Sequence, residues 1–367
     1  MNLLAPPTQK SKESQLVTKD SFQTISLLGK GSYAKVLLVK KIDTGEEFAM
    51  KILKKKLVFD KHQEKHVQSE KEILSHMNGC PFFVNFFYSF QNDKKLFFVL
   101  EYCQGGELFN LIQKHKQLNE SQTRFYACQL VLALESLHSK NIIYRDLKPE
   151  NVLLDKDGYI KITDFGLSKT NVVENDAKSI CGTPEYLAPE VVLLLKYGKP
   201  VDWWTLGCII FEMLTGLPPF FKNNRKELFE GIKFENPKLP RNLTYEAKLI
   251  LSQLLHKDPT KRLGSKGAEE VRSHPWFTGV NWQFVIDKRY GPPFNVDLGS
   301  NNGIQNFDKV FTAADPESLD NQESHGRFPG FSYNHENPNQ LPRNMSQLEE
   351  VPGERQANNE GDGMHIE

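Results

Sequence analysis

The stretch YRDLKPENVLL and the tripeptide DFG that follows it contain side chains suited to one kind of chemistry. The stretch carries the carboxylate of Asp146, the ammonium of Lys148 and the amide of Asn151. The tripeptide adds a second carboxylate, Asp164. Magnesium prefers oxygen ligands shared with phosphate, so Asn151 and Asp164 are the expected metal ligands. Because phosphoryl transfer needs positioning and charge neutralisation more than covalent chemistry, these four residues favour that reaction.

A glycine-rich stretch near the N-terminus, GKGSYAKV at residues 29–36, could hold phosphates through its backbone N–H groups. On its own it is better explained as a tight hairpin turn, and a dinucleotide fold would need a helix where a strand is expected. In the following EEFAMKI, strand alternation places Lys51 on the face opposite three apolar side chains. A buried lysine needs a partner, and Glu70 on the next expected helix could supply it. Both residues could equally be surface charges.

The surrounding pattern predicts the elements that position these residues. Residues 22–53 alternate as strands do, and FFVNFFYSF and KLFFVLEY indicate two more buried strands. A short hairpin is expected around Asp157 and Gly158. Helical patterns cover residues 61–77, 121–140, 201–215, 225–233 and 245–256. The predicted fold is α+β with two lobes: a β-rich N-terminal lobe with one main helix, a larger helical C-terminal lobe, and a hinge near residues 101–106.

The composition excludes several classes of protein. The 367 residues carry 46 Lys+Arg and 46 Asp+Glu, so no global charge favours nucleic acid or a membrane surface. The five cysteines are scattered without CxxC pairing, which favours reduced thiols in a cytoplasmic protein, with the nucleus as a second location. No apolar run is long enough for a transmembrane segment, and the start is too polar for a signal peptide.

The order of these motifs resembles that of the eukaryotic protein kinases. The order is the glycine-rich loop, Lys51, Glu70, the YRD loop, DFG and the APE at residues 188–190. The resemblance covers residues 22–277. It narrows to the AGC group through YRD, SICGTPEYLAPE and VDWWTLG, and through PPF and NFD in the tail. Akt, the ribosomal protein kinases and protein kinase C are the most similar kinds, and the sequence does not choose among them.

The resemblance implies an ATP site between the lobes. Lys51 would hold the α- and β-phosphates with Glu70 as its support, Asp146 would orient the substrate hydroxyl, and Lys148 would contact the γ-phosphate. One departure is that Ala34 replaces the third glycine of the loop, which should stiffen it. The expected ATP-binding residues are Leu28, Gly29, Lys30, Gly31, Ser32, Tyr33, Ala34, Val36, Ala49, Lys51, Leu100, Glu101, Cys103, Glu107 and Leu153.

The same resemblance implies a protein substrate with Ser or Thr as the acceptor. Glu107, Glu150, Thr183 and Glu230 match substrate-binding positions of kinases that select basic residues upstream of the target. Arginine pairs with carboxylates in a bidentate manner, which explains that preference. Solvated surface glutamates are the alternative, above all for Glu230.

Two serines are expected to regulate the chain by resemblance. Ser179, in KSICGT, matches the activation-loop site of an upstream phosphoinositide-dependent kinase, and His66, Arg145 and Lys169 match the positions that receive this phosphate; an ordinary loop serine is the alternative. Ser332 lies in FPGFSY, which resembles the AGC hydrophobic motif.

The hydrophobic motif should fold back onto the N-terminal lobe beside the 61–77 helix. Phe328 and Phe331 would enter a pocket, and a phosphate on Ser332 would add charged contacts, with Lys55 and Lys71 as candidate partners. Recruitment of another protein is the alternative use of these aromatics. Ser318 is a candidate second tail site, although the Ser/Thr-Pro signature of the family is absent there. The pocket residues expected are Val58, Phe59, Val67 and Leu96.

The sequence thus predicts a flexible leader (1–21), a kinase domain (22–277, with lobes 22–101 and 107–277), an AGC tail (278–333) and an acidic disordered tail (334–367). It predicts a monomeric serine/threonine protein kinase that uses ATP and Mg²⁺. A pseudokinase scaffold is a second class, but it would normally lack one of Lys51, Asp146, Asn151 or Asp164. A small-molecule kinase is disfavoured by CGTPEYLAPE, which resembles a peptide platform.

Overall fold

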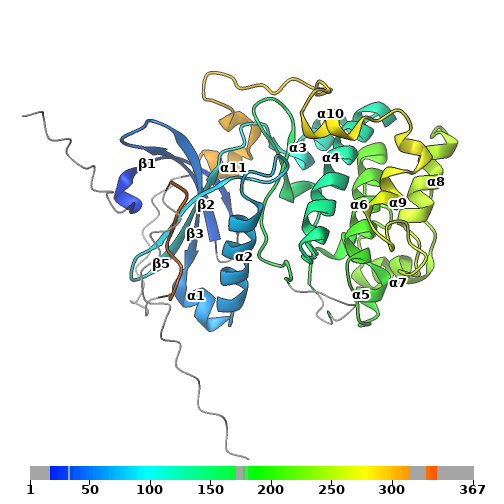
Figure 1. Cartoon of the computed structure of the whole chain (residues 1–367), viewed down its shortest axis with the longest axis horizontal. Helices are drawn as coiled ribbons and strands as arrows, with labels where there is room; N and C mark the ends of the chain where they lie inside the picture. The colour runs from blue at the N-terminus through cyan, green and yellow to red at the C-terminus, as the bar shows by residue number, and fades with distance from the viewer. Residues whose placement is uncertain (1–16, 32–33, 171–176, 178–180, 315–327, 337–367) are drawn as a thin grey trace, which may run out of the picture.

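The computed structural model describes residues 17–31, 34–170, 177, 181–314 and 328–336. Two lobes lie side by side, one built mainly of strands and the other mainly of helices (Figure 1). The expected ordering of a β-rich lobe before a helical one is confirmed. No helix that the structure describes has the length and hydropathy needed to cross a bilayer.

The N-terminal lobe is a six-stranded sheet in which each neighbouring pair is antiparallel. Its spatial order is β1-β2-β3-β5-β4-β9. The strands are β1 (Phe22–Lys30), β2 (Ala34–Lys41), β3 (Glu47–Lys54), β4 (Phe86–Gln91), β5 (Lys95–Glu101) and β9 (Tyr333–Asn334).

The helix expected at residues 61–77 differs at its start. The structure has a short α1 (Lys55–Asp60) and then α2 (Glu64–Met77). His62, between them, adopts a left-handed backbone with φ 51°, which an α-helix does not tolerate. The segment ahead of the sheet, which the sequence predicts as part of a flexible leader, forms a 3₁₀ turn at Lys19–Ser21.

The C-terminal lobe is built around α6 (Pro200–Thr215), which is buried on almost every side. A helix that is apolar all round belongs in a core. The lobe contains the small sheet β6 (Gly106–Glu107), β7 (Val152–Leu154) and β8 (Ile160–Ile162). Its helices are α3 (Leu108–His115), α4 (Glu120–Ser139), α5 (Pro189–Val192), α6 (Pro200–Thr215), α7 (Arg225–Phe234), α8 (Tyr245–Leu254) and α9 (Ala268–Arg272). Four 3₁₀ turns join or follow these elements, at Pro149–Asn151, Pro184–Tyr186, Pro275–Phe277 and Ile304–Asn306.

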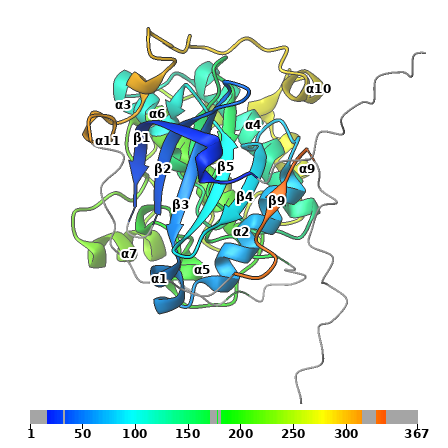
Figure 2. The same ribbon diagram turned by 90° about the vertical axis from the view of Figure 1, so that its left-hand side faces the viewer.

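After the helical lobe the chain returns to the N-terminal lobe. This segment contains α10 (Trp282–Ile286) and α11 (Lys309–Thr312), and α11 packs against β1. At the opposite edge of the sheet, β9 lies next to β4 and near α2 (Figure 2). Both edges of the N-terminal sheet are thus covered by residues from the C-terminal part of the chain.

Candidate active site

Lys51 lies on β3 with its ammonium between two carboxylates. Its Nζ is 2.5 Å from Glu70 Oε1 on α2 and 3.1 Å from Asp164 Oδ1. The Lys51 and Glu70 side chains are only 13% and 4% exposed. The expected pairing is therefore confirmed, and the alternative that both are surface charges is wrong.

The charges around Lys51 keep it ionised. Burial alone lowers the pKa of the amine, but the carboxylates of Asp164 and Glu70 outweigh burial and hold the pKa above its ordinary value. In return Lys51 lowers the pKa of Asp164 against the opposing effect of burial. An ammonium and a carboxylate therefore face the same space at neutral pH.

The loop before β7 places Asp146 in a network that fixes both of its carboxylate oxygens. Asn151 Nδ2 donates to Asp146 Oδ2 at 2.9 Å, and Lys148 Nζ lies 3.1 Å from the same oxygen. The N–H and hydroxyl of Thr183 donate to Asp146 Oδ1 at 3.2 and 3.3 Å. Lys148 Nζ also lies 2.9 Å from the Thr183 hydroxyl oxygen. The structure thus brings together Asp146, Lys148, Asn151 and Thr183, as expected.

The donor set fits Mg²⁺. Since Asn151 Nδ2 is used in bonds to Asp146, the remaining polar atom of that amide is its oxygen. Asp164 offers a carboxylate whose side chain is 50% exposed. No cluster of three or more His, Cys, Asp or Glu side chains that could hold a metal occurs in the described parts of the chain. A hard cation here would therefore complete its shell with phosphate oxygens and water, as Mg²⁺ does.

A buried carboxylate on α6 binds the backbone of this loop. Asp202 accepts from the backbone N–H groups of Tyr144 and Arg145 at 3.0 and 2.9 Å and lies 2.8 Å from His138 Nε2. Arg145 has φ 70° and Asp164 has φ 57°, a region that residues with a Cβ rarely occupy. Such backbone persists only where the surroundings hold it in place.

A second buried brace lies further from the loop. Arg262 and Glu190 form a bidentate pair at 2.6 and 2.8 Å.

The expected ATP-binding residues lie at the lobe boundary. Gly29 pairs with Val36 in the β1–β2 register, and Gly31 N–H donates to the Ala34 carbonyl oxygen at 2.8 Å. A strand follows the glycine-rich loop, as the argument against a dinucleotide fold required. Ser32 and Tyr33 lie outside the described residues. The others are placed on β1 (Leu28, Gly29, Lys30), just after it (Gly31), on β2 (Ala34, Val36), on β3 (Ala49, Lys51), at and after the end of β5 (Leu100, Glu101, Cys103), on β6 (Glu107) and on β7 (Leu153).

The segment after α10 contacts the hinge directly. In the sequence, only the NFD motif at residues 306–308 indicates such a contact. Tyr102 donates from its hydroxyl to the Asn302 carbonyl oxygen at 3.1 Å, and Phe307 stacks on its ring at 5.9 Å. Asn306 Nδ2 donates to the Gln104 carbonyl oxygen at 2.8 Å. A Cβ on Gly106 would lie 2.4 Å from the Asn306 carbonyl oxygen, so only glycine permits this approach.

Acidic side chains gather beside the catalytic loop. Burial, with the charges of Glu150 and Asp308, raises the pKa of Glu107 to about 7. Burial also raises the pKa of Glu150. Glu212 was not predicted: burial raises its pKa to about 7 against the opposing hydrogen bond from Tyr186, with Glu150 and Glu185 adding to the rise.

Glu230 is placed differently from this cluster. It lies on α7, is 51% exposed and forms an ion pair with Lys233. The reading of Glu230 as a solvated surface residue therefore gains support.

The residues expected to receive an activation-loop phosphate line one cavity. His66, Arg145 and Lys169 share a cavity of about 630 Å³ with Lys65 and Ala177. Ser179 itself, like Ser318, lies outside the described residues. The cavity is open between α2 and the catalytic loop and presents several cationic or titratable side chains.

The hydrophobic motif docks on the N-terminal lobe as expected. Phe328 and Phe331 are 5% and 0% exposed. Phe331 meets Phe98 edge-to-face at 5.1 Å, and Phe328 lies 6.3 Å from Phe59. The expected pocket residues Val58, Val67 and Leu96 belong to the same core cluster, with Phe59 packed against it.

Polar contacts fix the backbone of the motif. Lys71 Nζ donates to the Gly330 carbonyl oxygen at 2.6 Å, and Ser89 donates to that of Phe331 at 2.5 Å. Ser332 is exposed, whereas Lys55 is 1% exposed. The contacts continue past residue 333, where the motif segment was predicted to end: Tyr88 donates to Glu336 at 2.6 Å. The backbone pairing of β9 with β4 also extends to Asn334. Because strand pairing uses backbone groups, the polar sequence of this segment does not predict it.

Comparison with known proteins agrees with this geometry. Residues 22–277 match the sequence model of the protein kinase domain. The chain is 42% identical to the RAC family serine/threonine-protein kinase homolog of Dictyostelium discoideum, over 90% of this chain and 76% of that protein. It is 43% identical to RAC-beta serine/threonine-protein kinase B of Xenopus laevis (88% and 69%) and 41% identical to serine/threonine-protein kinase Sgk1 of Xenopus tropicalis (90% and 84%). The chain therefore belongs to the protein kinase family and is a serine/threonine-protein kinase of the AGC group.

Proposed function

We propose that Lys51, Asp146 and Lys148 carry the transfer of the γ-phosphate of ATP to serine and threonine hydroxyls of protein substrates, with Mg²⁺ held by Asn151 and Asp164. The observation that carries this proposal is the ion-pair chain Glu70–Lys51–Asp164, at 2.5 and 3.1 Å. It joins a strand and a helix of one lobe to the loop of the other across the nucleotide site.

Each residue has a task that its surroundings allow. Lys51, held as an ammonium, neutralises the α- and β-phosphates. The Asp146 carboxylate, fixed at both oxygens, accepts a hydrogen bond from the substrate hydroxyl and turns its oxygen toward the γ-phosphate. Lys148 lies beside it and neutralises charge on the transferring group. Bound Mg²⁺ would supply further neutralisation of phosphate charge.

The test is turnover in two variants. Lys51→Met and Asp146→Asn should each lower turnover by on the order of 10²–10³, the effect of removing preorganised charge at a transferring phosphoryl group. Asp164→Asn should abolish Mg²⁺-dependent phosphate incorporation, which also separates an active kinase from a scaffold. Full turnover in both Lys51→Met and Asp146→Asn, in samples free of other kinases, would contradict the assignment.

We also propose that the substrate carries basic residues upstream of the target. The support is the group Glu107, Glu150 and Glu212 beside the catalytic loop: burial raises the pKa of each, and the charge of Glu150 adds to the rise at Glu107 and Glu212. A positional-scanning peptide library should select Arg or Lys at one or more upstream positions. Equal selection of neutral residues there would contradict this preference.

Regulation is the third part of the proposal. An upstream phosphoinositide-dependent-type kinase would phosphorylate Ser179, and the cavity lined by His66, Arg145 and Lys169 would receive the phosphate. Phosphate on Ser332 would strengthen the docked motif, with Lys71 or Lys55 as its partner, and Ser318 is a further candidate. If Ser179→Ala were as active as wild type fully phosphorylated at Ser179, this mechanism would be wrong.

The chain would act as a monomer in the cytoplasm or nucleus. Light scattering of the purified protein and microscopy of a tagged chain test the two statements separately. A stable dimer would contradict the first, and confinement to a membrane compartment would contradict the second.

A further inference from the structure

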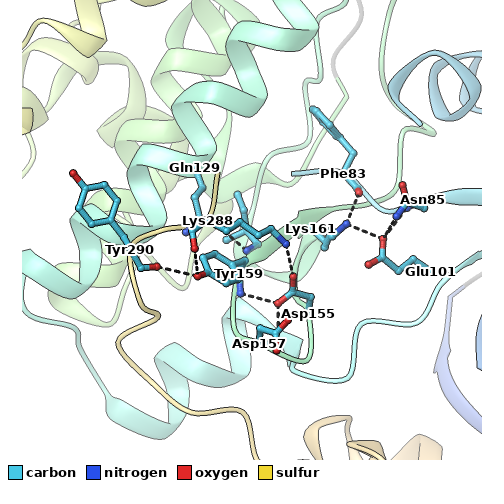
Figure 3. Close-up of polar contacts among 11 residues, drawn as sticks. Phe83, Asn85, Glu101, Gln129, Asp155, Asp157, Tyr159, Lys161, Lys288 and Tyr290 are labelled. Carbon is cyan, nitrogen blue, oxygen red and sulfur yellow. Dashed lines mark hydrogen bonds and ion pairs between the residues drawn. The ribbon is translucent and has the colours of Figure 1, made fainter. Parts of the chain in front are cut away.

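A buried lysine on β8, Lys161, reaches the back of the hinge. Its Nζ lies 2.8 Å from Glu101 Oε2 and donates to the Phe83 carbonyl oxygen at 3.3 Å. The Lys161 side chain is 7% exposed. Figure 3 shows this ammonium between Phe83 and Glu101 on the strand that leads to the DFG tripeptide. A charge buried to this extent is retained only with a close partner, and Glu101 is that partner.

The same carboxylate is tied to the N-terminal lobe. Asn85 donates to Glu101 Oε2 from its backbone N–H at 3.0 Å and from its side chain at 2.8 Å (Figure 3). In the other direction the Glu101 N–H donates to the Asn85 carbonyl oxygen at 2.9 Å. One carboxylate oxygen thus accepts three donors from two lobes, and the peptide group of Glu101 has little rotational freedom.

Glu101 is the first residue of the hinge and the last residue of β5. The amino group of adenine can only donate hydrogen bonds, so it needs an acceptor on the protein. In the nucleotide site proposed above, the acceptor assigned to this amino group is the backbone carbonyl of Glu101, the residue at which β5 ends. Its direction depends on how the residue is held from behind.

A second ion pair on the same hairpin offers a matched comparison. Lys288 Nζ lies 2.8 Å from Asp155 Oδ2, the same separation as in the Lys161 pair. Tyr159 donates from its hydroxyl to the carbonyl oxygens of Lys288 and Tyr290 (Figure 3). This pair joins the β7–β8 hairpin to the segment after α10 and not to Glu101.

We propose that Lys161 is a positioning residue that directs the Glu101 carbonyl toward the adenine amino group and so favours ATP over purine nucleotides that lack this group. The proposal rests on the nucleotide site proposed above. Lys161 does not touch the nucleotide; it acts through the Glu101 side chain. The Lys288 pair, which lacks the contact with Glu101, has no such role.

The test compares KM for ATP with KM for the triphosphate of purine riboside, which has hydrogen in place of the amino group. Lys161→Met should raise KM for ATP by about 3- to 10-fold, the equivalent of one neutral hydrogen bond. KM for the amino-free nucleotide and kcat with either nucleotide should stay within about twofold, because no group that contacts the phosphates is changed. Lys161→Arg keeps the charge and should restore most of the preference for ATP.

The control is Lys288→Met, which makes the same chemical change in a pair of the same length and should leave the nucleotide preference unaltered. An equal rise in KM for both nucleotides, or the same loss of preference in Lys288→Met, would overturn the proposal. If Lys161→Met does not fold, Lys161→Gln gives the same comparison, with folding verified by its melting temperature. A wild-type chain that uses neither nucleotide would instead contradict the proposed function.

Discussion

The two halves of the candidate active site are held in place by different means. The half in the C-terminal lobe, with Asp146 and Asn151, lies over Asp202, a fully buried carboxylate that is bonded to the loop backbone. The half in the N-terminal lobe, with Lys51 and Glu70, depends on α2, whose neighbours include tail residues more than two hundred positions away in sequence. The first half is built into a core, whereas the second depends on a docked segment that could leave.

This difference suits regulation. A loop that must orient a substrate hydroxyl gains from rigid backbone, because small misplacement costs much turnover. A helix that carries one member of an ion pair can serve as a switch if its support is separable. The tail motif, with two buried phenylalanines and polar contacts to Lys71, Ser89 and Gln91, is such a support.

The largest expected effect comes from the rigid half. Asp202→Ala should lower turnover by at least about 100-fold, because Tyr144 and Arg145 lose the acceptor that holds the loop. It should also lower the melting temperature, since the N–H groups are left unpaired in a buried place. Calorimetry and single-turnover kinetics measure the two losses. Normal turnover in a folded Asp202→Ala protein would contradict the claim that Asp202 holds the catalytic loop in place.

A smaller effect is expected when the docked support is removed. Phe328→Ala combined with Phe331→Ala should lower turnover by about 10-fold, within the range of coupling between two sites in one protein. Steady-state assays with Ser179 phosphorylation matched between samples measure this change. The control is Phe234→Ala, the same substitution at a residue 71% exposed on the C-terminal lobe. Unchanged activity of the isolated double variant would instead favour recruitment of another protein by these aromatics.

A change of pH should also affect the two halves of the active site differently. Glu107 has a pKa raised to about 7, so it loses its charge as the pH falls through that value, whereas the raised pKa of Lys51 keeps the ammonium charged. KM for a basic peptide should therefore rise by up to about 10-fold between about pH 8 and about pH 6, the screened equivalent of a charged hydrogen bond. KM for ATP should rise less than KM for the basic peptide, because Glu107 is one of many expected ATP-binding residues and Lys51 keeps its charge. A peptide without basic residues is the control, and a parallel rise in its KM would point to another titrating group.

The smallest effect concerns one polar anchor of the tail. Lys71→Met removes the bond to the Gly330 carbonyl oxygen and should lower turnover by about 2- to 5-fold, less than the loss of both phenylalanines. Lys56→Met, at an exposed position of α1, should have no effect. A larger effect from Lys71→Met than from the double phenylalanine variant would mean that Lys71 acts on something other than docking.

The sequence alone predicts those features that leave a pattern in neighbouring residues of the chain. The strand alternation around Lys51, the spacing from Asp146 to Asn151 and the paired phenylalanines of the tail each carry a local pattern, and each is placed as expected. Lys161, Asn85 and Glu212 carry no such pattern, because nothing within a single strand or helix distinguishes a buried polar side chain from an exposed one. The split between α1 and α2 was missed for a related reason: it depends on the backbone of His62, which the charged sequence around it conceals.

The most direct test of the comparison is hydrogen exchange in the Phe328→Ala, Phe331→Ala double variant, measured against wild type. Peptides that cover α2 and β4 should exchange faster once the motif no longer docks, because the docked residues pack against both elements. Peptides that cover the catalytic loop and α6 should exchange as they do in wild type, since Asp202 still holds them. Unchanged exchange in α2, or an equal increase in the catalytic loop and α6, would contradict the account that the two halves are supported separately.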